Sequence, residues 1–241
     1  MLKEPVQPDE RVVLNKPEAK LPIRPLTKDE FAEHVKNRVH RIAGEFTHGF
    51  EFLEGLERTI TFFGSARFKP DNPHYKMARE LGQRVSEYGF GVVTGGGPGI
   101  MEAGNRGAYE TNGESLGLNI HLPYEQATNP YVNRKMEFEY FFCRKVLMSY
   151  AAEAYVFFPG GFGTLDEFFE MLTLIQTHKI EKVPVICMGK DFWDPMQRFI
   201  KKYLYEENKA IDEEDMELYT ITDDIEEALD IIRVAPIRRQ N

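Results

Sequence analysis

Cysteine is scarce in this sequence, and the two cysteines that it has lie far apart. Cys143 and Cys187 form no close-spaced pair, so neither a zinc site nor a disulfide framework is suggested. No apolar run approaches the roughly 18 residues of a membrane span, and residues 1–5 lack the apolar core of a signal peptide. We therefore expect a cytoplasmic protein with no metal site and no membrane partner.

Positive charge is also in short supply. The formal net charge is −9 and the pI is near 5.3, whereas a protein that binds nucleic acid non-specifically needs a basic face. This deficit argues against nucleic acid as a partner. The length of 241 residues suits one large α/β domain, or one domain with an appendage, and allows a substantial buried core.

The chain begins with two segments that differ from the rest. Residues 1–26 contain five prolines among mixed charges, which indicates an extended arm. Residues 27–58 form a helical segment, because apolar residues recur there at spacings of three and four. Residues 27–30 fit a capping box, while Gly44 and Gly49 weaken the middle of the helix. We expect its apolar stripe to pack on the body of the protein or on a partner subunit.

The remainder, residues 59–241, alternates short apolar runs with helical patterns, as βαβ units do. We expect an α/β fold, a Rossmann-like, doubly wound and mainly parallel sheet with the N-terminal helical segment as an extension. The expected strands are 59–63, 91–94, 116–120, 137–142, 154–158, 183–188 and 219–222. The expected helices are 74–88, 98–109 with Pro98 in its first turn, 144–152, 165–175, 193–205 and one capped by Asp223 or Asp224.

Three glycine-bearing turns follow strands, at residues 64–65, 95–99 and 160–163. Parallel strands place their carboxyl ends on one edge of the sheet, where ligands of open α/β sheets bind. Exposed amides in such turns, together with the positive end of a helix dipole, make a seat for a phosphate. No G-x-G-x-x-G frame fits a dinucleotide, and no Gly-Lys-Ser/Thr completes a Walker loop. A mononucleotide or a sugar phosphate is the better candidate.

The stretch PGGFGTLDE at residues 159–167 dominates the sequence, because it joins an apolar strand to an amphipathic helix. Glu167 lies one turn beyond the expected phosphate seat, where it can reach the group that the phosphate carries. Thr164 and Glu167 also fit a capping box. From this stretch alone, Glu167 could either cap the helix or take part in catalysis. The glycines favour catalysis, because a cap needs at most one of Gly160, Gly161 and Gly163.

Arg144 and Lys145 provide a second indication of an anion site. Two cations at the start of a helix oppose its dipole, and arginine offers a rigid fork of donors for phosphate, ribose oxygens or a carboxylate. The alternative is that both form surface ion pairs with nearby glutamates. Glu102 either caps its helix or touches the sugar, and Glu170 is either solvated or a second acid.

Together these motifs resemble the Lonely Guy (LOG) family, cytokinin riboside 5′-monophosphate phosphoribohydrolases that are often mislabelled as lysine decarboxylases. The matching stretches are FGSAR at 63–67, GGGPGIMEA at 95–103, Arg144-Lys145 and PGGFGTLDE at 159–167. The resemblance covers about residues 59–234. The long N-terminal segment, LNIHLP at 118–123 and NPY at 129–131 resemble the longer bacterial branch.

The resemblance implies a Rossmann-like fold, a homodimer or higher oligomer with active sites near subunit contacts, and no cofactor. It implies hydrolysis of a nucleoside 5′-monophosphate to the free base and ribose 5-phosphate, with Arg144 and Glu167 as the catalytic residues. Tyr140 stands where many members have methionine, so it is expected to stack on or border the purine. The residues expected to bind the substrate are Ser65, Gly96, Gly97, Gly99, Glu102, Tyr140, Lys145, Gly160, Gly161, Gly163, Thr164 and Glu170.

We hypothesise cleavage of the glycosidic bond through a ribose with oxocarbenium character. Glu167 stabilises that charge or positions the attacking water, and Arg144 holds the substrate and orients Glu167. One rival is a nucleotide-binding sensor or carrier without turnover, since the same cradle would serve it. Another is a decarboxylase, which needs PLP on a lysine, and Lys145 is the lysine expected near the cleft.

Overall fold

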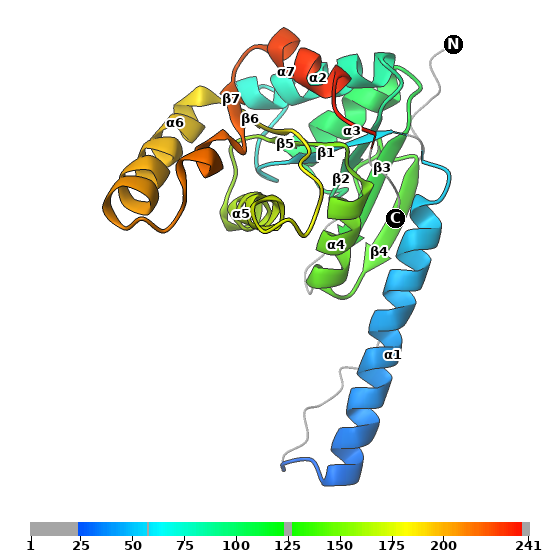
Figure 1. The fold of residues 1–241 in the computed structure, drawn as a ribbon. Helices are drawn as coiled ribbons and strands as arrows, with labels where there is room; N and C mark the ends of the chain where they lie inside the picture. Colours follow the sequence, from blue (N-terminus) through cyan, green and yellow to red (C-terminus); the bar gives the residue numbers. More distant parts are fainter. Residues whose placement is uncertain (1–23, 57, 123–126, 238–241) are drawn as a thin grey trace.

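The computed structural model describes residues 24–56, 58–122 and 127–237, and within them it shows a seven-stranded, all-parallel sheet (Figure 1). The strand order is β4-β3-β2-β1-β5-β6-β7. The strands are β1 Thr59–Phe63, β2 Gly91–Thr94, β3 Ser115–Ile120, β4 Arg134–Phe138, β5 Ala154–Phe157, β6 Val185–Met188 and β7 Thr220–Thr222. The expected Rossmann-like α/β fold is confirmed. Most of the arm expected at 1–26, and the end of the chain after 237, lie outside the described residues.

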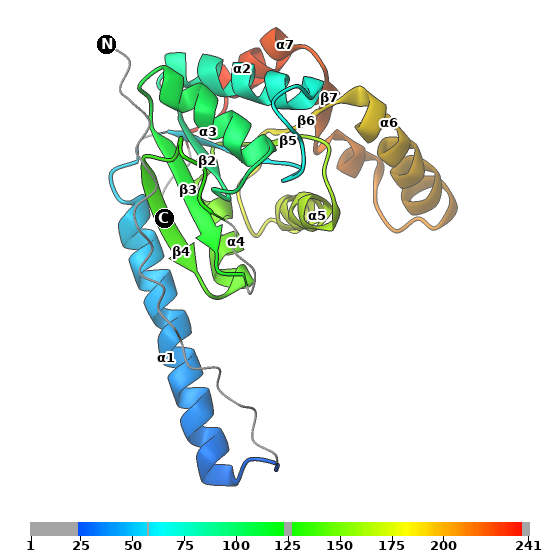
Figure 2. The ribbon, with the colours of Figure 1, turned by 180° about the vertical axis from the view of Figure 1, so that it is seen from behind.

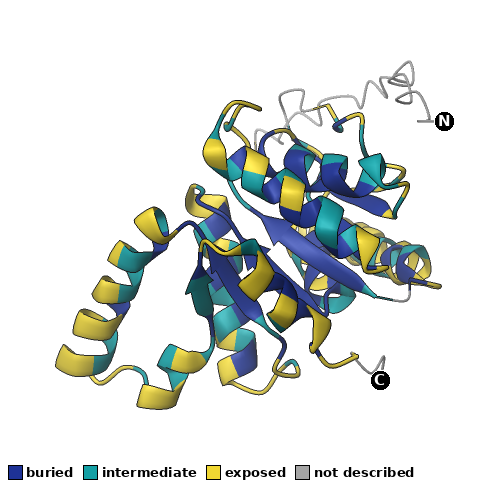
Figure 3. Cartoon of the chain, turned by 90° about the horizontal axis from the view of Figure 1, so that it is seen from above, coloured by how far each residue is buried: buried dark blue, intermediate teal, exposed yellow. Residues whose placement is uncertain are grey.

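Helices cover both faces of the sheet, as the alternation of strand and helix patterns predicts. The helices are α1 Lys28–Leu53, α2 Pro73–Glu87, α3 Ile100–Glu110, α4 Phe141–Ala151, α5 Phe162–Gln176, α6 Lys190–Phe199 and α7 Ile225–Arg233, with a π-helix at Ile200–Glu207 and a 3-10 helix at Glu213–Glu217. One core lies between the sheet and α2, α3 and α7, and the other between the sheet and α4, α5 and α6. Consecutive residues of β1 serve both cores, since Phe62 belongs to the first and Phe63 to the second. The middle strands are therefore buried on both faces (Figure 3).

Helix α1 is one continuous helix despite its two glycines. A capping box between Thr27 and Glu30 starts it, as the sequence predicts. Near its end Gly49 allows close packing on α4, because a Cβ there would lie 2.8 Å from Leu147 Cγ. The first half extends away from the body (Figures 1 and 2), and Phe31 is 59% exposed there. No helix of the described residues is long and apolar enough to span a membrane.

The strand expected at 137–142 and the helix expected from Arg144 are both displaced. Strand β4 ends at Phe138, and α4 already starts at Phe141. The reason lies in α1: the carboxylate of Glu45 accepts hydrogen bonds from the backbone N–H of Glu139 at 2.7 Å and of Tyr140 at 3.3 Å. These bonds replace a continued strand ladder. Arg144 is thus in the second turn of α4, and the expectation that it opens the helix is wrong.

Pro98 is likewise outside the helix whose first turn it was expected to occupy. Helix α3 starts at Ile100 after Gly99, which has a φ of +71°. At the other end of the chain, Asp224 caps α7 by accepting from Glu226 N–H at 2.8 Å. Its neighbour Asp223 accepts from the N–H of Gly189 and of Lys190 at the start of α6.

The strand order places a topological switch at β1. The chain proceeds from β1 outward through β2 and β3 to β4, and then returns to the other side of β1 as β5. The loops that leave β1 and its neighbours diverge at such a point and leave a crevice beyond the carboxyl ends of the strands. Here the three glycine turns follow β1, β2 and β5, which are adjacent.

Candidate functional site

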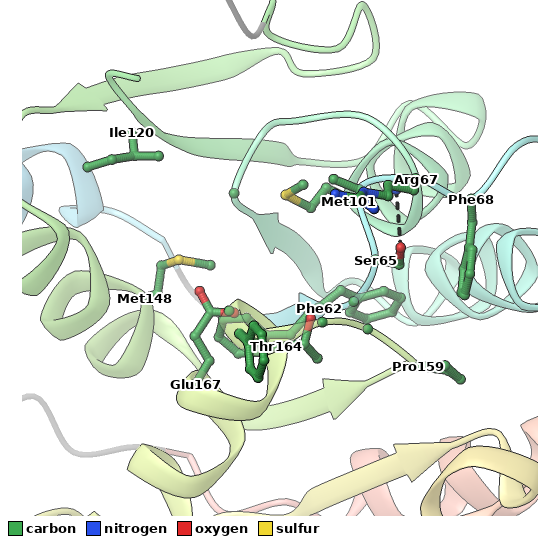
Figure 4. A pocket seen from close by; sticks show the side chains of 18 of the residues that line it. Phe62, Ser65, Arg67, Phe68, Met101, Ile120, Met148, Pro159, Thr164 and Glu167 are labelled. Carbon is green, nitrogen blue, oxygen red and sulfur yellow. Dashed lines mark hydrogen bonds between the residues drawn. The ribbon is translucent and has the colours of Figure 1, made fainter. Parts of the chain in front are cut away.

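A pocket of about 690 Å³ lies at this switch point (Figure 4). The turn after β1 and the turn after β5 form much of its wall, and Gly95 after β2 contributes to it. Residues of α3, α4, α5 and α6 and of the end of β3 also line it. The edge of the sheet that the glycine turns indicate is therefore hollow.

Arg144 and Glu167 meet in this pocket. Arg144 Nη2 lies 3.0 Å from Glu167 Oε1, so α4 and α5 are joined by an ion pair. Their side chains are only 11% and 14% exposed. Arg144 Nε is buried and has no hydrogen-bond partner within the described residues, although the residue lines the pocket. Arg144 therefore has a donor that its pairing with Glu167 leaves unused.

Burial sets the protonation of this pair. Burial raises the pKa of Glu167 to about 7, against the opposing effect of the Arg144 charge. Burial also lowers the pKa of Arg144, whereas the charges of Glu167 and Asp166 act in the other direction. A carboxyl group that titrates near neutral pH inside a pocket is typical of a functional site.

The first turn of α5 faces the pocket. The helix starts at Phe162, its N-cap is Gly161, and no side chain caps it. The capping-box interpretation of Thr164 is therefore wrong, because Thr164 lies inside the helix and Glu167 pairs with Arg144. The unpaired N–H groups of a helix start and the helix dipole favour an anion. Ser65 also lines the pocket, across from this turn.

The turn at 95–99 is packed differently from the other two. The N–H of Gly96 donates to Thr94 Oγ1 at 2.9 Å, and its carbonyl accepts from the N–H of Asn129. Asn129 Nδ2 also donates to the carbonyl of Gly97 at 3.0 Å. A Cβ at Gly99 would overlap the carbonyl oxygen of Ser65. Gly96, Gly97 and Gly99 lie outside the lining of the pocket and shape the turn from behind.

Four other residues expected to bind substrate also lie outside this lining. Lys145 Nζ forms ion pairs of 3.1 Å with both Asp166 and Glu170. Glu102 accepts a hydrogen bond from the hydroxyl of Tyr75 at 2.7 Å. Tyr140 is the N-cap residue of α4, and its hydroxyl accepts from Arg41 Nε at 3.4 Å.

Seven of the expected residues do line the pocket. They are Ser65, Arg144, Gly160, Gly161, Gly163, Thr164 and Glu167. Of the 14 residues that the sequence singles out for the site, the structure brings these together, and their roles toward a substrate stay predictions. Most of these seven residues belong to the turn after β5 or to the pair Arg144–Glu167.

Sequence reasoning missed several residues of the pocket wall. Arg67 adds a second arginine, and its N–H donates to Ser65 Oγ at 3.1 Å (Figure 4). Asn119 lies near the carboxyl end of β3, and Met101 and Met148 come from α3 and α4. The position of Asn119 at the end of an expected strand is a signal that could have found it. The two methionines look like core residues in the sequence.

Comparison with known proteins relates this chain to one family. The family model described as "Possible lysine decarboxylase" matches residues 101–232. A rice (Oryza sativa subsp. japonica) protein named cytokinin riboside 5′-monophosphate phosphoribohydrolase LOG is 31% identical over 149 residues, 60% of each chain. A protein of Rhodococcoides fascians with the same enzyme name is 24% identical over 147 residues, 60% of this chain and 74% of its own. The chain thus spans about 60% of the length of the rice relative.

Solved structures share the fold. A structural-genomics target named TM1055 superimposes with a TM-score of 0.56 at 24% identity, covering 73% of this chain and 98% of its own. The molybdenum cofactor carrier protein of Chlamydomonas reinhardtii gives a TM-score of 0.55 at 21% identity, covering 73% and 96%. At these identities the likeness concerns the arrangement of helices and strands alone.

Proposed function

This chain belongs to the possible lysine decarboxylase (LOG) family, and from that membership we propose that it hydrolyses the N-glycosidic bond of a purine nucleoside 5′-monophosphate. The products are the free base and ribose 5-phosphate. The rice and Rhodococcoides relatives carry the name of that reaction for cytokinin riboside monophosphates. The observation that carries the proposal is the buried Arg144–Glu167 pair beside the uncapped start of α5.

The uncapped start of α5 seats the phosphate. Its free amides and dipole attract the anion, and Thr164 and Ser65 add hydroxyl groups to the same wall. Arg67 supplies a positive charge at this end of the pocket. Holding the remote phosphate provides binding energy that can be used at the anomeric carbon.

Glu167 lies one helical turn beyond Thr164, so it faces the ribose when the phosphate is seated. The bond between the anomeric carbon and the base breaks as that carbon becomes positively charged. The Glu167 carboxylate stabilises this charge or positions the water that attacks the same carbon. The water gives its oxygen to ribose 5-phosphate, and the base leaves with a proton. Arg144 orients Glu167 through their ion pair and directs its unused Nε toward the substrate.

Decarboxylation, which the family description names, would need PLP on a lysine. Among the described residues that line the pocket there is no lysine. Burial alone would lower the pKa of Lys145, but its bonds to Asp166 and Glu170 raise that pKa overall. A protonated, doubly paired amine is a poor nucleophile for a Schiff base. The pocket therefore does not fit PLP, and we derive no step through it.

Turnover distinguishes the hydrolase from a nucleotide sensor or carrier. The purified protein is incubated with AMP, a prenylated AMP and other nucleoside monophosphates, and ribose 5-phosphate and free base are measured together. Equal amounts of both products support the proposal. Saturable binding of a nucleotide with no release of base would contradict it and identify a carrier.

A further inference from the structure

Asn119 belongs to the pocket wall, and the oxygen of its side-chain amide has no hydrogen-bond partner within the described residues. The residue is 7% exposed and lines the pocket near the end of β3. Its Oδ1 is buried and has no hydrogen-bond partner within the described residues. Buried polar side-chain atoms are nearly always hydrogen-bonded in folded proteins. An unpartnered amide in the wall of a cavity therefore indicates a polar group of a ligand.

The backbone around Asn119 fixes the position of this amide. A Cβ at Gly96 would overlap Asn119 Oδ1, and a Cβ at Gly117 would lie 3.1 Å from it. Gly96 also has a φ of +69°, a conformation that favours glycine. The second glycine turn thus leaves room for the Asn119 side chain, and the amide is held by packing before any ligand arrives.

Apolar side chains line the same pocket. They include Ile120, Met148 and Met101, and Figure 4 shows Ile120 and Met148 on the side away from Phe68 and Pro159, with Met101 beside Arg67. Flexible thioethers adapt well to the face of an aromatic ring. Binding sites for flat organic groups are mostly apolar with a few placed polar groups that fix orientation. This end of the pocket has that composition.

The sheet order places this end opposite the phosphate seat. Three strand spacings separate β3 from β5, which is roughly 14 Å at about 4.8 Å per strand. Arg144 lies between them, because its Nη1 is 3.3 Å from where a Cβ of Gly95, after β2, would be. A nucleotide with its phosphate at α5 and its ribose at Arg144 and Glu167 then extends its base toward Asn119.

Resting on the proposed function, we propose that Asn119 determines base specificity by recognising the 6-amino edge of the purine. Its Oδ1 accepts a hydrogen bond from the N6–H group, and its Nδ2 donates to N7, the pairing that asparagine makes with adenine elsewhere. A 6-oxo purine presents two acceptors on that edge, so Oδ1 faces O6 and repels it. A single substituent on N6 leaves one N–H, so N6-substituted adenines keep the contact.

The test compares AMP with inosine 5′-monophosphate (IMP), which differs at position 6. We expect the native protein to have at least a tenfold higher kcat/KM for AMP. In Asn119→Ala the AMP/IMP ratio should fall by at least tenfold, because the acceptor that binds N6–H and repels O6 is lost. Asn119→Asp keeps an acceptor at this place and should keep the preference for AMP, although it loses the donor to N7, which both purines share. The ratio cancels effects common to both substrates, such as a small change in folding. Asn72→Asp, which keeps an N-cap on α2 outside the lining of the pocket, should leave the ratio unchanged.

Three results would overturn the inference. The native protein could treat AMP and IMP alike, or Asn119→Ala could lower the two rates equally. A loss of discrimination between AMP and 2′-deoxy-AMP, with the AMP/IMP ratio kept, would place Asn119 on the ribose instead. Calorimetric binding of AMP and IMP to Glu167→Gln, with and without Asn119→Ala, makes the same comparison without turnover. Absence of hydrolysis would therefore refute the proposed function while the binding ratio still tests Asn119.

Discussion

Glu167 Oε1 on α5 accepts a hydrogen bond from Arg144 Nη2 on α4 at 3.0 Å, inside a pocket and largely shielded from solvent. Desolvation costs free energy for both charges, and removing one partner of a buried pair leaves the other uncompensated. The pair is therefore an unusual arrangement to retain for stability alone. Its position beside the start of α5 is the one that the proposed mechanism requires.

Glu167→Ala and Arg144→Ala should each fold and yet release no free adenine from AMP. The expected loss in kcat/KM is at least a hundredfold, because each removes a group that acts on the reacting ribose. Release of adenine is measured by chromatography, and folding by circular dichroism and thermal unfolding. Arg84→Ala, which removes the ion pair with Glu226 on the surface, is the control and should keep full activity. Full activity in either pocket variant would remove that residue from the mechanism.

Activity should rise as the pH increases through about 7. Burial raises the pKa of Glu167 to about 7, and the carboxylate is the form that stabilises a positive ribose. The second ionisation of the phosphate, near pH 6, affects kcat/KM as well. The pH profile of kcat, measured at saturating AMP, separates the two. A kcat that is flat from pH 5.5 to 8.5 would contradict this role for Glu167.

The raised pKa of Glu167 also predicts how the stability of the folded protein depends on pH. The folded state holds the Glu167 proton more tightly than the unfolded chain, whose carboxyl has the ordinary pKa of 4.5. The group therefore contributes stability fully below pH 4.5 and loses that contribution between pH 4.5 and about 7. The difference in unfolding free energy between the native protein and Glu167→Gln should fall over this window, by about 3 kcal/mol. Urea unfolding at several pH values measures it, and a constant difference would refute the shifted pKa.

Gly99→Ala should destabilise the protein, by about 1–3 kcal/mol or more. Its φ is +71°, and the new Cβ would overlap the carbonyl oxygen of Ser65. Gly44→Ala provides the opposite control, because no atom lies within 4 Å of a Cβ at this position in α1. Alanine there should stabilise α1 by about 0.5–1 kcal/mol. Chemical unfolding measures the change in unfolding free energy for both variants. An unchanged unfolding free energy in Gly99→Ala would contradict the packing of this turn.

We expect the protein to form a homodimer or a higher oligomer through the outer half of α1. Phe31, Val35 and Val39 are exposed there and continue the stripe that packs on α4 nearer the body. Val35→Glu and Val39→Glu should therefore produce smaller particles in light scattering, with no loss of helix content. Lys36→Glu, a charge change on the same exposed stretch, is the control. A native protein that is monomeric at micromolar concentration would contradict the expectation.

The elements with strong local patterns could be predicted from the sequence. β1 and β2 have the expected bounds, and all their residues are buried because helices cover both faces of the sheet. The boundary between β4 and α4 could not be predicted, since Glu45 sets it from a distant part of the chain. No periodicity in residues 134–144 contains that information.

The residues of the candidate site likewise divide into those that the sequence predicts and those that it does not. The turn after β5 and the importance of Arg144 and Glu167 follow from motif and spacing. The pairing of Glu167 with Arg144, in place of a capping bond, required the position of α4. Met101 and Met148 could not be predicted, because an apolar helix residue has no pattern that separates a pocket wall from a core. Asn119 had one signal, its place at the end of an expected strand.

The bonds from Glu45 to the N–H groups of Glu139 and Tyr140 have a mechanical consequence. They clamp α1 to the first turn of α4, and Arg144 follows Tyr140 by four residues on that same helix. The long exposed half of α1 is therefore connected through Glu45 to the start of the helix that carries Arg144. A contact made on that half of α1 would act on the helix that positions the Arg144–Glu167 pair.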